Sequence, residues 1–194
     1  MPEFLYDLHP VSHITTGAVG VPGQRTFYIQ AQQGEQLVTL IAEKEQVRTL
    51  SESIRQLLAE IAAQGRALPK QSEEPTPAEM ALREPLDPLF RIAQLGLGYD
   101  AEQDLIVLVA QELLVEEGEE DEFLSDELPE VSRPDHEPHL VRFWATRAQM
   151  QAFSRQGLSA VSAGRPLCPQ CLQPMDASGH FCIKKNGHAG VSQA

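Results

Sequence analysis

Apolar residues, many of them β-branched or aromatic, recur in short stretches within the first 42 residues, a pattern typical of β-strands. Two tight turns separate these stretches, one at Val21-Pro22-Gly23-Gln24 and one at Gln33-Gly34-Glu35. Pro followed by Gly favours a type II turn, because Pro presets φ and Gly accepts a positive φ. The predicted strands cover about residues 13–20, 25–32 and 36–42, and residues 4–8 predict a short edge strand.

Residues from Glu43 to about Gly65 have the spacing of an amphipathic helix. Six apolar residues recur at spacings of three and four and therefore share one face: Val47, Leu50, Ile54, Leu57, Leu58 and Ile61. This apolar face is expected to pack against a sheet. The acidic residues Glu43 and Glu45 at its start favour the helix dipole, which explains them without catalysis.

A proline-rich stretch at residues 66–88 predicts a linker, and a second set of elements follows it. We predict strands at about residues 89–98, 104–115 and 139–145, and then a helix from Thr146 to about Ala163. Thr146 and Gln149 have the spacing of a capping box, in which each residue satisfies a backbone N–H of the other.

The second half of the chain echoes the first. Residues 37–50 align with residues 140–153 at a constant offset, and Leu, Val, Ala and Gln recur at matched places. We therefore predict a duplicated β-β-β-α unit, with repeat one at residues 1–65 and repeat two at residues 89–164. Such units imply an α+β domain over residues 1–164, in which antiparallel strands form the sheet and the helices pack on one face.

The negative charge is concentrated in one segment of repeat two. Eleven acidic residues and one basic residue lie between Glu116 and Glu137, a local charge of −10 within a total of −13. Residues 116–138 are therefore predicted to form an acidic, solvated loop, with docking of a basic partner as the alternative. The rest of the chain is close to neutral. This predicts no nucleic acid and no membrane as partners, since phosphate backbones and anionic lipids attract basic surfaces.

The expected cellular location follows from the lack of a membrane span, the lack of a signal segment and the placement of the cysteines. No apolar run reaches the roughly 18 residues of a membrane span, and the first residues have no basic and apolar signal segment. The three cysteines are confined to the tail, residues 165–194. An odd number of cysteines in one short segment fits metal ligation in a reducing compartment better than a disulfide framework. We expect a cytoplasmic protein.

The cysteines of the tail predict a zinc knuckle. Cys168-Pro-Gln-Cys171 places two thiolates on one side of a tight bend, and Cys182 adds a third sulfur. The fourth ligand of Zn²⁺ is His180, two residues before Cys182, or His188, six residues after it. Four protein ligands leave no open position, so the site is expected to be structural rather than catalytic. A thioredoxin-like redox pair is disfavoured, because no strand–helix context precedes the motif.

The glycine-rich stretch at residues 17–25 is interpreted as a hairpin rather than a phosphate-binding loop, because a strand and not a helix follows it. Arg25, Thr26 and Gln30 are the polar residues expected to line a cleft where the two repeats meet. The four histidines outside the tail are scattered along the sequence, so we assign no catalytic constellation.

Three stretches together resemble a known family: Gly20-Val-Pro-Gly-Gln-Arg-Thr-Phe-Tyr-Ile-Gln30, Glu43-Lys-Glu-Gln46 and the tail from Gly164 to Gly187. The chain resembles the bacterial family filed as domain of unknown function 3090. The resemblance implies a tail motif of Cys-Pro-x-Cys followed by Gly-His-x-Cys, which favours His180 as the fourth ligand. The chain departs from the family pattern after the last cysteine, where Ile183-Lys184 replaces Pro-Arg.

The family has no established activity. Its members are often encoded beside a histidine-phosphatase-like protein and a lipid-kinase-like protein, which implies a shared phosphoryl pathway as an expectation. We predict a cytoplasmic, zinc-stabilised binding or adaptor protein for a protein partner or small ligand. The alternative is an enzyme or accessory factor of a phosphoryl or nucleotide pathway with a cleft near Arg25. A nucleic-acid-binding zinc module is disfavoured by the charge balance.

Overall fold

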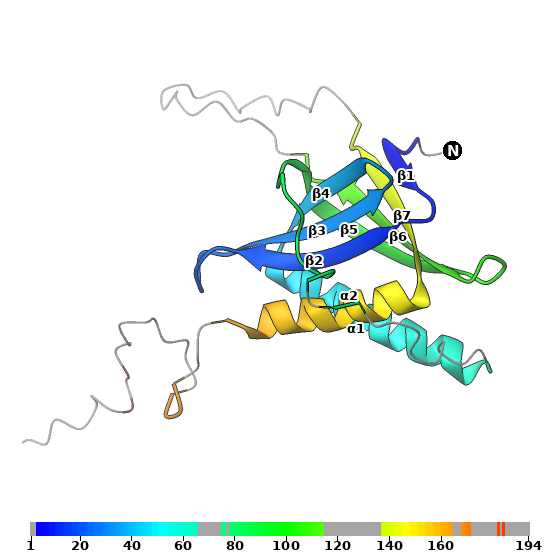
Figure 1. The fold of residues 1–194 in the computed structure, drawn as a ribbon. Helices are drawn as coiled ribbons and strands as arrows, with labels where there is room; N and C mark the ends of the chain where they lie inside the picture. Colours follow the sequence, from blue (N-terminus) through cyan, green and yellow to red (C-terminus); the bar gives the residue numbers. More distant parts are fainter. Residues whose placement is uncertain are drawn as a thin grey trace, which may run out of the picture.

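The computed structural model describes residues 3–65, 75–76, 78–114, 137–164, 168–171, 182 and 184. In this part of the chain seven strands form one sheet, and two helices lie side by side along one side of it (Figure 1). The elements are β1 (Tyr6–Leu8), β2 (His13–Val19), β3 (Thr26–Gln33), β4 (Gln36–Ala42), α1 (Lys44–Ala63), β5 (Pro88–Asp100), β6 (Leu105–Glu112), β7 (Leu140–Thr146) and α2 (Arg147–Ser162). The predicted α+β class is confirmed.

The local signals that predicted the elements are present as hydrogen bonds. Gly23 has a φ of +99°, and the N–H of Gln24 donates to the carbonyl of Val21 at 2.9 Å, which confirms the first turn. The capping box of α2 is also confirmed, because the N–H of Thr146 donates to Gln149 at 2.9 Å and the N–H of Gln149 donates back to the Thr146 hydroxyl at 3.2 Å. These contacts fix where β2 ends and where α2 begins.

The sheet is mixed, whereas the sequence predicted antiparallel strands. Its strand order is β1-β7-β6-β5-β4-β3-β2, and two neighbouring pairs, β4 with β5 and β1 with β7, are parallel. The physical reason for the first pair is the helix α1 between its strands, since a crossover connection returns the chain to the end where the previous strand began. Each half of the chain is internally antiparallel, as predicted.

One N-terminal stretch joins the two sides of the sheet. The N–H of Val11 donates to the carbonyl of Trp144 in β7 at 2.8 Å, and the next N–H, of Ser12, donates to Gln32 in β3 at 2.7 Å. β7 and β3 lie next to opposite ends of the strand order. Because consecutive residues bond to both, the sheet must curl until these two strands approach each other (Figure 1).

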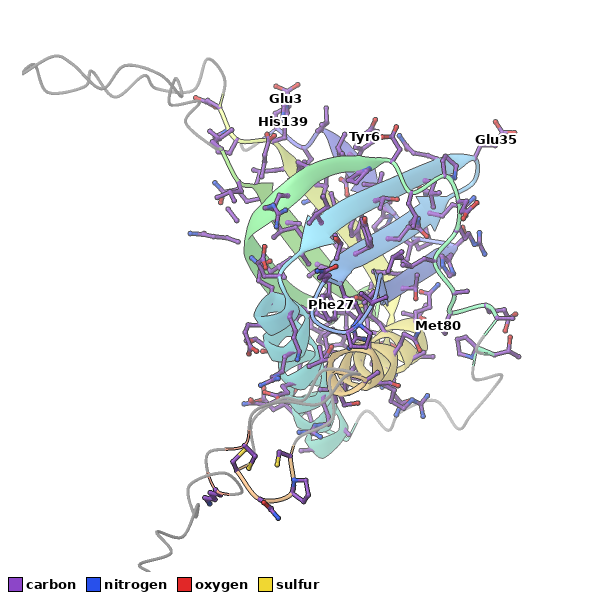
Figure 2. All side chains as sticks on the ribbon, turned by 90° about the vertical axis from the view of Figure 1, so that its left-hand side faces the viewer. Glu3, Tyr6, Phe27, Glu35, Met80 and His139 are labelled. Carbon is purple, nitrogen blue, oxygen red and sulfur yellow. The ribbon has the colours of Figure 1, made fainter. Side chains whose placement is uncertain are left out.

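The helices cover the inner face of the curled sheet and pack against each other. The apolar stripe predicted for α1 is buried at five of its six positions, and Leu57 is partly buried against the same core. Figure 2 shows Phe27 of β3 directed from the sheet toward the helices, and its side chain is only 5% exposed. At the helix crossing, the Ser154 hydroxyl donates to the Ser51 carbonyl at 2.7 Å, so the two backbones lie close together.

The described part of the predicted linker packs on the opposite face of the sheet. Gln30 points away from its core-facing neighbours in β3, as strand alternation requires, and is fully buried. Its amide receives the N–H of Arg83 at 2.7 Å and donates to the Arg83 carbonyl at 2.9 Å. Met80 is also buried in this segment (Figure 2). Residues 78–84 therefore cover β2 and β3 rather than connecting the halves freely.

Three further expectations from the sequence concern the acidic loop, the internal duplication and membrane-spanning helices. The acidic loop at residues 116–138 lies outside the described residues, apart from its last two positions. The internal duplication stays a prediction, although each half contains three main strands followed by a helix. Within the described ranges no helix is long and apolar enough to cross a membrane.

A salt-bridge cluster holds β1 against β7. Asp7 accepts hydrogen bonds from Arg142 at 3.0 Å and from the Trp144 indole at 2.8 Å, and the Arg142 guanidinium lies 4.2 Å from the centre of the Phe4 ring. The hydrogen bond from Arg142 lowers the pKa of Asp7 most, the Trp144 bond lowers it further, and partial burial opposes both. The folded state therefore favours the ionised carboxylate.

We expect Asp7→Asn to lower the free energy of unfolding at neutral pH by about 1 kcal/mol or less, because the cluster is partly exposed. The pKa of Asp7 is lower in the folded than in the unfolded state, so its contribution is present above about pH 4 and is lost as the pH falls further. Urea unfolding at pH 7 and pH 3 measures the difference between variant and wild type. That difference should shrink at pH 3, whereas the exposed Asp87→Asn control should change little at either pH.

A second prediction concerns the helix crossing at Gly157. A Cβ at this position would overlap the Ser51 Oγ and would lie 3.2 Å from Thr16 and 3.3 Å from Val47. We expect Gly157→Ala to destabilise the fold by about 1–2 kcal/mol, because overpacking outweighs the gain in helix propensity. Chemical unfolding checks this value, with Ser159→Ala on the exposed side of α2 as control. A stabilised Gly157→Ala protein would contradict the close crossing.

Candidate functional site

The three cysteines come together as the sequence predicted. Their sulfur atoms all lie within 4.8 Å of one another, and Cys168 Sγ is 3.8 Å from Cys182 Sγ. Four ligands arranged tetrahedrally at a zinc–sulfur distance of about 2.3 Å place their sulfur atoms about 3.8 Å apart. The spacing of these thiols therefore fits one metal ion, and Cys171 completes the set of three.

The backbone of the bend favours the thiolate form of Cys168. The N–H groups of Cys171 and Gln170 point at its sulfur and lower the pKa of the thiol to about 7, with Cys171 contributing most. A thiolate is the form that binds a metal, so this turn prepares a ligand near neutral pH. The three thiols and the backbone around Cys168 thus both favour metal binding.

The cluster is shielded locally and stands apart from the main core. Cys168 and Cys182 are each 5% exposed, yet neither belongs to the hydrophobic core formed by the sheet and helices. Figure 1 shows residues 168–171 beyond the end of α2, apart from the sheet. His180 and His188, the two candidates for the fourth ligand, lie outside the described residues.

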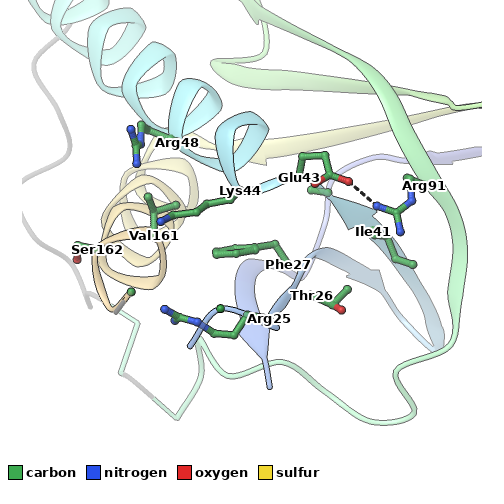
Figure 3. A pocket seen from close by; sticks show the side chains of 13 residues that line it. Arg25, Thr26, Phe27, Ile41, Glu43, Lys44, Arg48, Arg91, Val161 and Ser162 are labelled. Carbon is green, nitrogen blue, oxygen red and sulfur yellow. Dashed lines mark hydrogen bonds and ion pairs between the residues drawn. The ribbon is translucent and has the colours of Figure 1, made fainter. Parts of the chain in front are cut away.

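A second candidate site is a pocket of about 650 Å³ beside Arg25, which we call the Arg25 pocket. It opens where the end of β4, the start of α1, the end of α2 and Arg91 of β5 meet, so both halves of the chain line it (Figure 3). Of the polar residues predicted for a cleft, Arg25 and Thr26 line this pocket. Gln30 does not, because it is buried under residues 78–84.

Four basic side chains and one carboxylate, that of Glu43, line the Arg25 pocket. Arg25 donates to the carbonyls of Ala160, at 3.3 Å, and Ala163 at the end of α2. Arg91 forms an ion pair with Glu43. The remaining two are Lys44 and Arg48 on the first turns of α1, and Arg48 lies 3.5 Å from Glu45.

Sequence reasoning missed Lys44, Arg48 and Arg91 as residues of this pocket. Arg91 reaches it through the parallel pairing of β4 and β5, which sets Arg91 opposite Ile41. No local sequence pattern reports such a pairing. Lys44 and Arg48 did carry a signal, since residues four apart on a helix share one face, and the helix had been predicted.

The chain matches the model of a protein family. Neither the curated proteins nor the solved structures include a match to this chain. The model of the family described as protein of unknown function (DUF3090) matches residues 6–182, a span that includes the whole sheet, both helices and all three cysteines. The chain belongs to this family of unknown function.

Proposed function

We propose that the protein is a zinc-stabilised binding protein that holds a small ligand in the Arg25 pocket. The observation that carries the proposal is the pair of prepared sites, namely three thiols at metal-binding spacing and a pocket lined by both halves. The tail leaves α2 at Gly164, which lines the pocket, only four residues before Cys168. A metal that fastens the tail would therefore also restrain one edge of the pocket.

Zinc is the metal we propose, with His180 as its fourth ligand beside Cys168, Cys171 and Cys182. Soft thiolates select zinc over magnesium or calcium, and three sulfurs with one imidazole are a common closed site. A tail of this length cannot bury a core of its own, so the metal takes the place of one. The odd number of cysteines and their confinement to one short segment also support the proposed cytoplasmic location.

The lining of the Arg25 pocket supports binding rather than catalysis. Glu43 is the carboxylate of the lining and is already ion-paired with Arg91, so it is poorly suited to act as a free general base. Cationic side chains hold and orient an anion without chemistry. The cationic lining also favours an alternative function, an enzyme or accessory factor in phosphoryl chemistry, in which the ligand itself supplies the reacting groups.

We also propose that the two halves are copies of one unit. Support comes from equivalent glutamines at the third position of each helix, Gln46 and Gln149. Each accepts the N–H of the residue that caps its helix and donates its amide to a backbone carbonyl of the other half, Gln46 to Ile92 in β5 at 3.1 Å and Gln149 to Val11 between β1 and β2 at 3.2 Å. Two independent sequences would have little reason to share this contact.

The metal site predicts the composition of the purified protein. We expect about one equivalent of zinc per chain by elemental mass spectrometry, and we expect Cys171→Ser to lose most of it, because three ligands hold zinc far less tightly than four. His180→Ala should lose zinc in the same way, whereas His188→Ala should retain it. Loss in His188→Ala alone would make His188 the fourth ligand, and well under one equivalent in the wild type would contradict the zinc site.

Removing the metal tests whether it acts on the tail alone. Because the cysteines lie outside the main core, chelation should leave the melting temperature of the sheet and helices within about 2 °C of its starting value. Trypsin should cut the tail after Lys184 and Lys185 much faster once the metal is removed. Circular dichroism and timed proteolysis followed by mass spectrometry measure the two effects. A collapse of the whole fold on chelation would contradict the proposed role as a fastening of the tail.

A further inference from the structure

We propose that the ligand of the Arg25 pocket is a phosphate monoester carried on a small organic group. This inference rests on the proposed binding function and names the chemical class that the pocket recognises. The first observation is the concentration of charge. The whole chain has 15 basic residues and a net charge of −13, yet four of the basic side chains line this one pocket with one carboxylate.

The basic groups converge and are not fully neutralised by the protein. Lys44 Nζ and Arg25 Nη2 both lie within 4 Å of the point where a Cβ on Gly164 would stand, so the two cations approach the same spot. Within the described part of the chain, no carboxylate lies within 4.0 Å of Lys44. Like charges held this close repel each other, and an anion between them removes that cost.

The shape of the pocket indicates an anion with an organic part. Its volume of about 650 Å³ is far larger than a bare phosphate needs and is typical of sites for small organic ligands. The lining also includes the apolar side chains of Phe27, Ile41 and Val161. In Figure 3 the ring of Phe27 lies between Lys44 above and Arg25 below, so an organic group packed against Phe27 would leave its anionic end among the cations.

Phosphate fits the lining better than a single carboxylate does. A phosphate monoester carries a charge between −1.5 and −2 near pH 7 and offers three strong acceptor oxygens. Arg25 lies directly before β3, whereas Lys44 and Arg48 lie on the first turns of α1. The three cations therefore approach from two directions, and each can bind a different phosphate oxygen. A carboxylate has one negative charge and two oxygens, so it would leave more of the lining uncompensated.

The experiment is isothermal calorimetry on zinc-loaded protein at about 0.1 M ionic strength. The probes are adenosine monophosphate, ribose phosphate, inorganic phosphate, adenosine and citrate. We expect binding of at least one of the two phosphate monoesters, at least about tenfold tighter than that of inorganic phosphate, adenosine or citrate. Equal binding of adenosine and adenosine monophosphate, equal binding of citrate, or no binding of either monoester would overturn the proposal.

Variants then locate the site. Lys44→Gln and Arg48→Gln should each weaken the monoester about tenfold or more, and both positions are on an accessible helix turn, so folding should be unaffected. Arg55→Gln is the matched control, because it removes the same charge from the exposed surface of α1 two turns away and outside the pocket. An equal loss in Arg55→Gln, or none in Lys44→Gln, would overturn the assignment. If the zinc-loaded protein binds neither monoester, the inferred ligand class is wrong, but the zinc site stands. If the purified protein contains no zinc, the proposed function itself is contradicted.

Discussion

The parallel pairing of β4 with β5 is the contact on which the rest of the architecture depends. The two three-stranded halves are each antiparallel, and this pairing merges them into one sheet. A corresponding parallel pairing of β1 with β7 brings the N-terminus to the far half. Because the N-terminal stretch then continues into β2 beside β3, the two sides of the sheet are tied by one short piece of chain. The curl that results gives the helices a concave face to fill.

The same pairing creates the Arg25 pocket. It places Arg91 of the second half beside the end of β4, at the point where α1 begins. The end of α2 comes to the same place and is held there by Arg25, which donates to two of its last carbonyls. A basic residue is favourable at a helix C-terminus, because the carbonyl groups there carry partial negative charge. One side of the pocket is thus fixed by the fold before any ligand enters.

Much of the fold could be predicted because its signals are local. The spacing of Val47, Leu50 and Ile54 predicts α1, and Pro22-Gly23 predicts the first turn, from residues that are close in sequence. The cysteines could be predicted for the same reason, since the bend at residues 168–171 is local and its chemistry is distinctive. The strand pairing between the halves and the arrival of Arg91 depend on contacts across about 50 residues, which no local pattern encodes. The packing of residues 78–84 over Gln30 was not predicted either. A proline-rich sequence predicts a linker whether or not the segment packs against the sheet.

The net charge illustrates how a property of the whole chain differs from that of a site. A total of −13 disfavours long polyanions, which must approach over a broad surface and meet the acidic residues as well as the basic ones. A small ligand interacts chiefly with groups within the Debye length, about 8 Å at physiological salt, and in the Arg25 pocket these groups are mostly cations. The segment from Glu116 to Glu137 holds eleven acidic residues and one basic residue, a net charge of −10, so most of the net negative charge belongs to a part of the sequence distinct from the pocket lining. Such a distribution favours one small phosphate over a nucleic acid, and the selectivity comes from size as much as from charge.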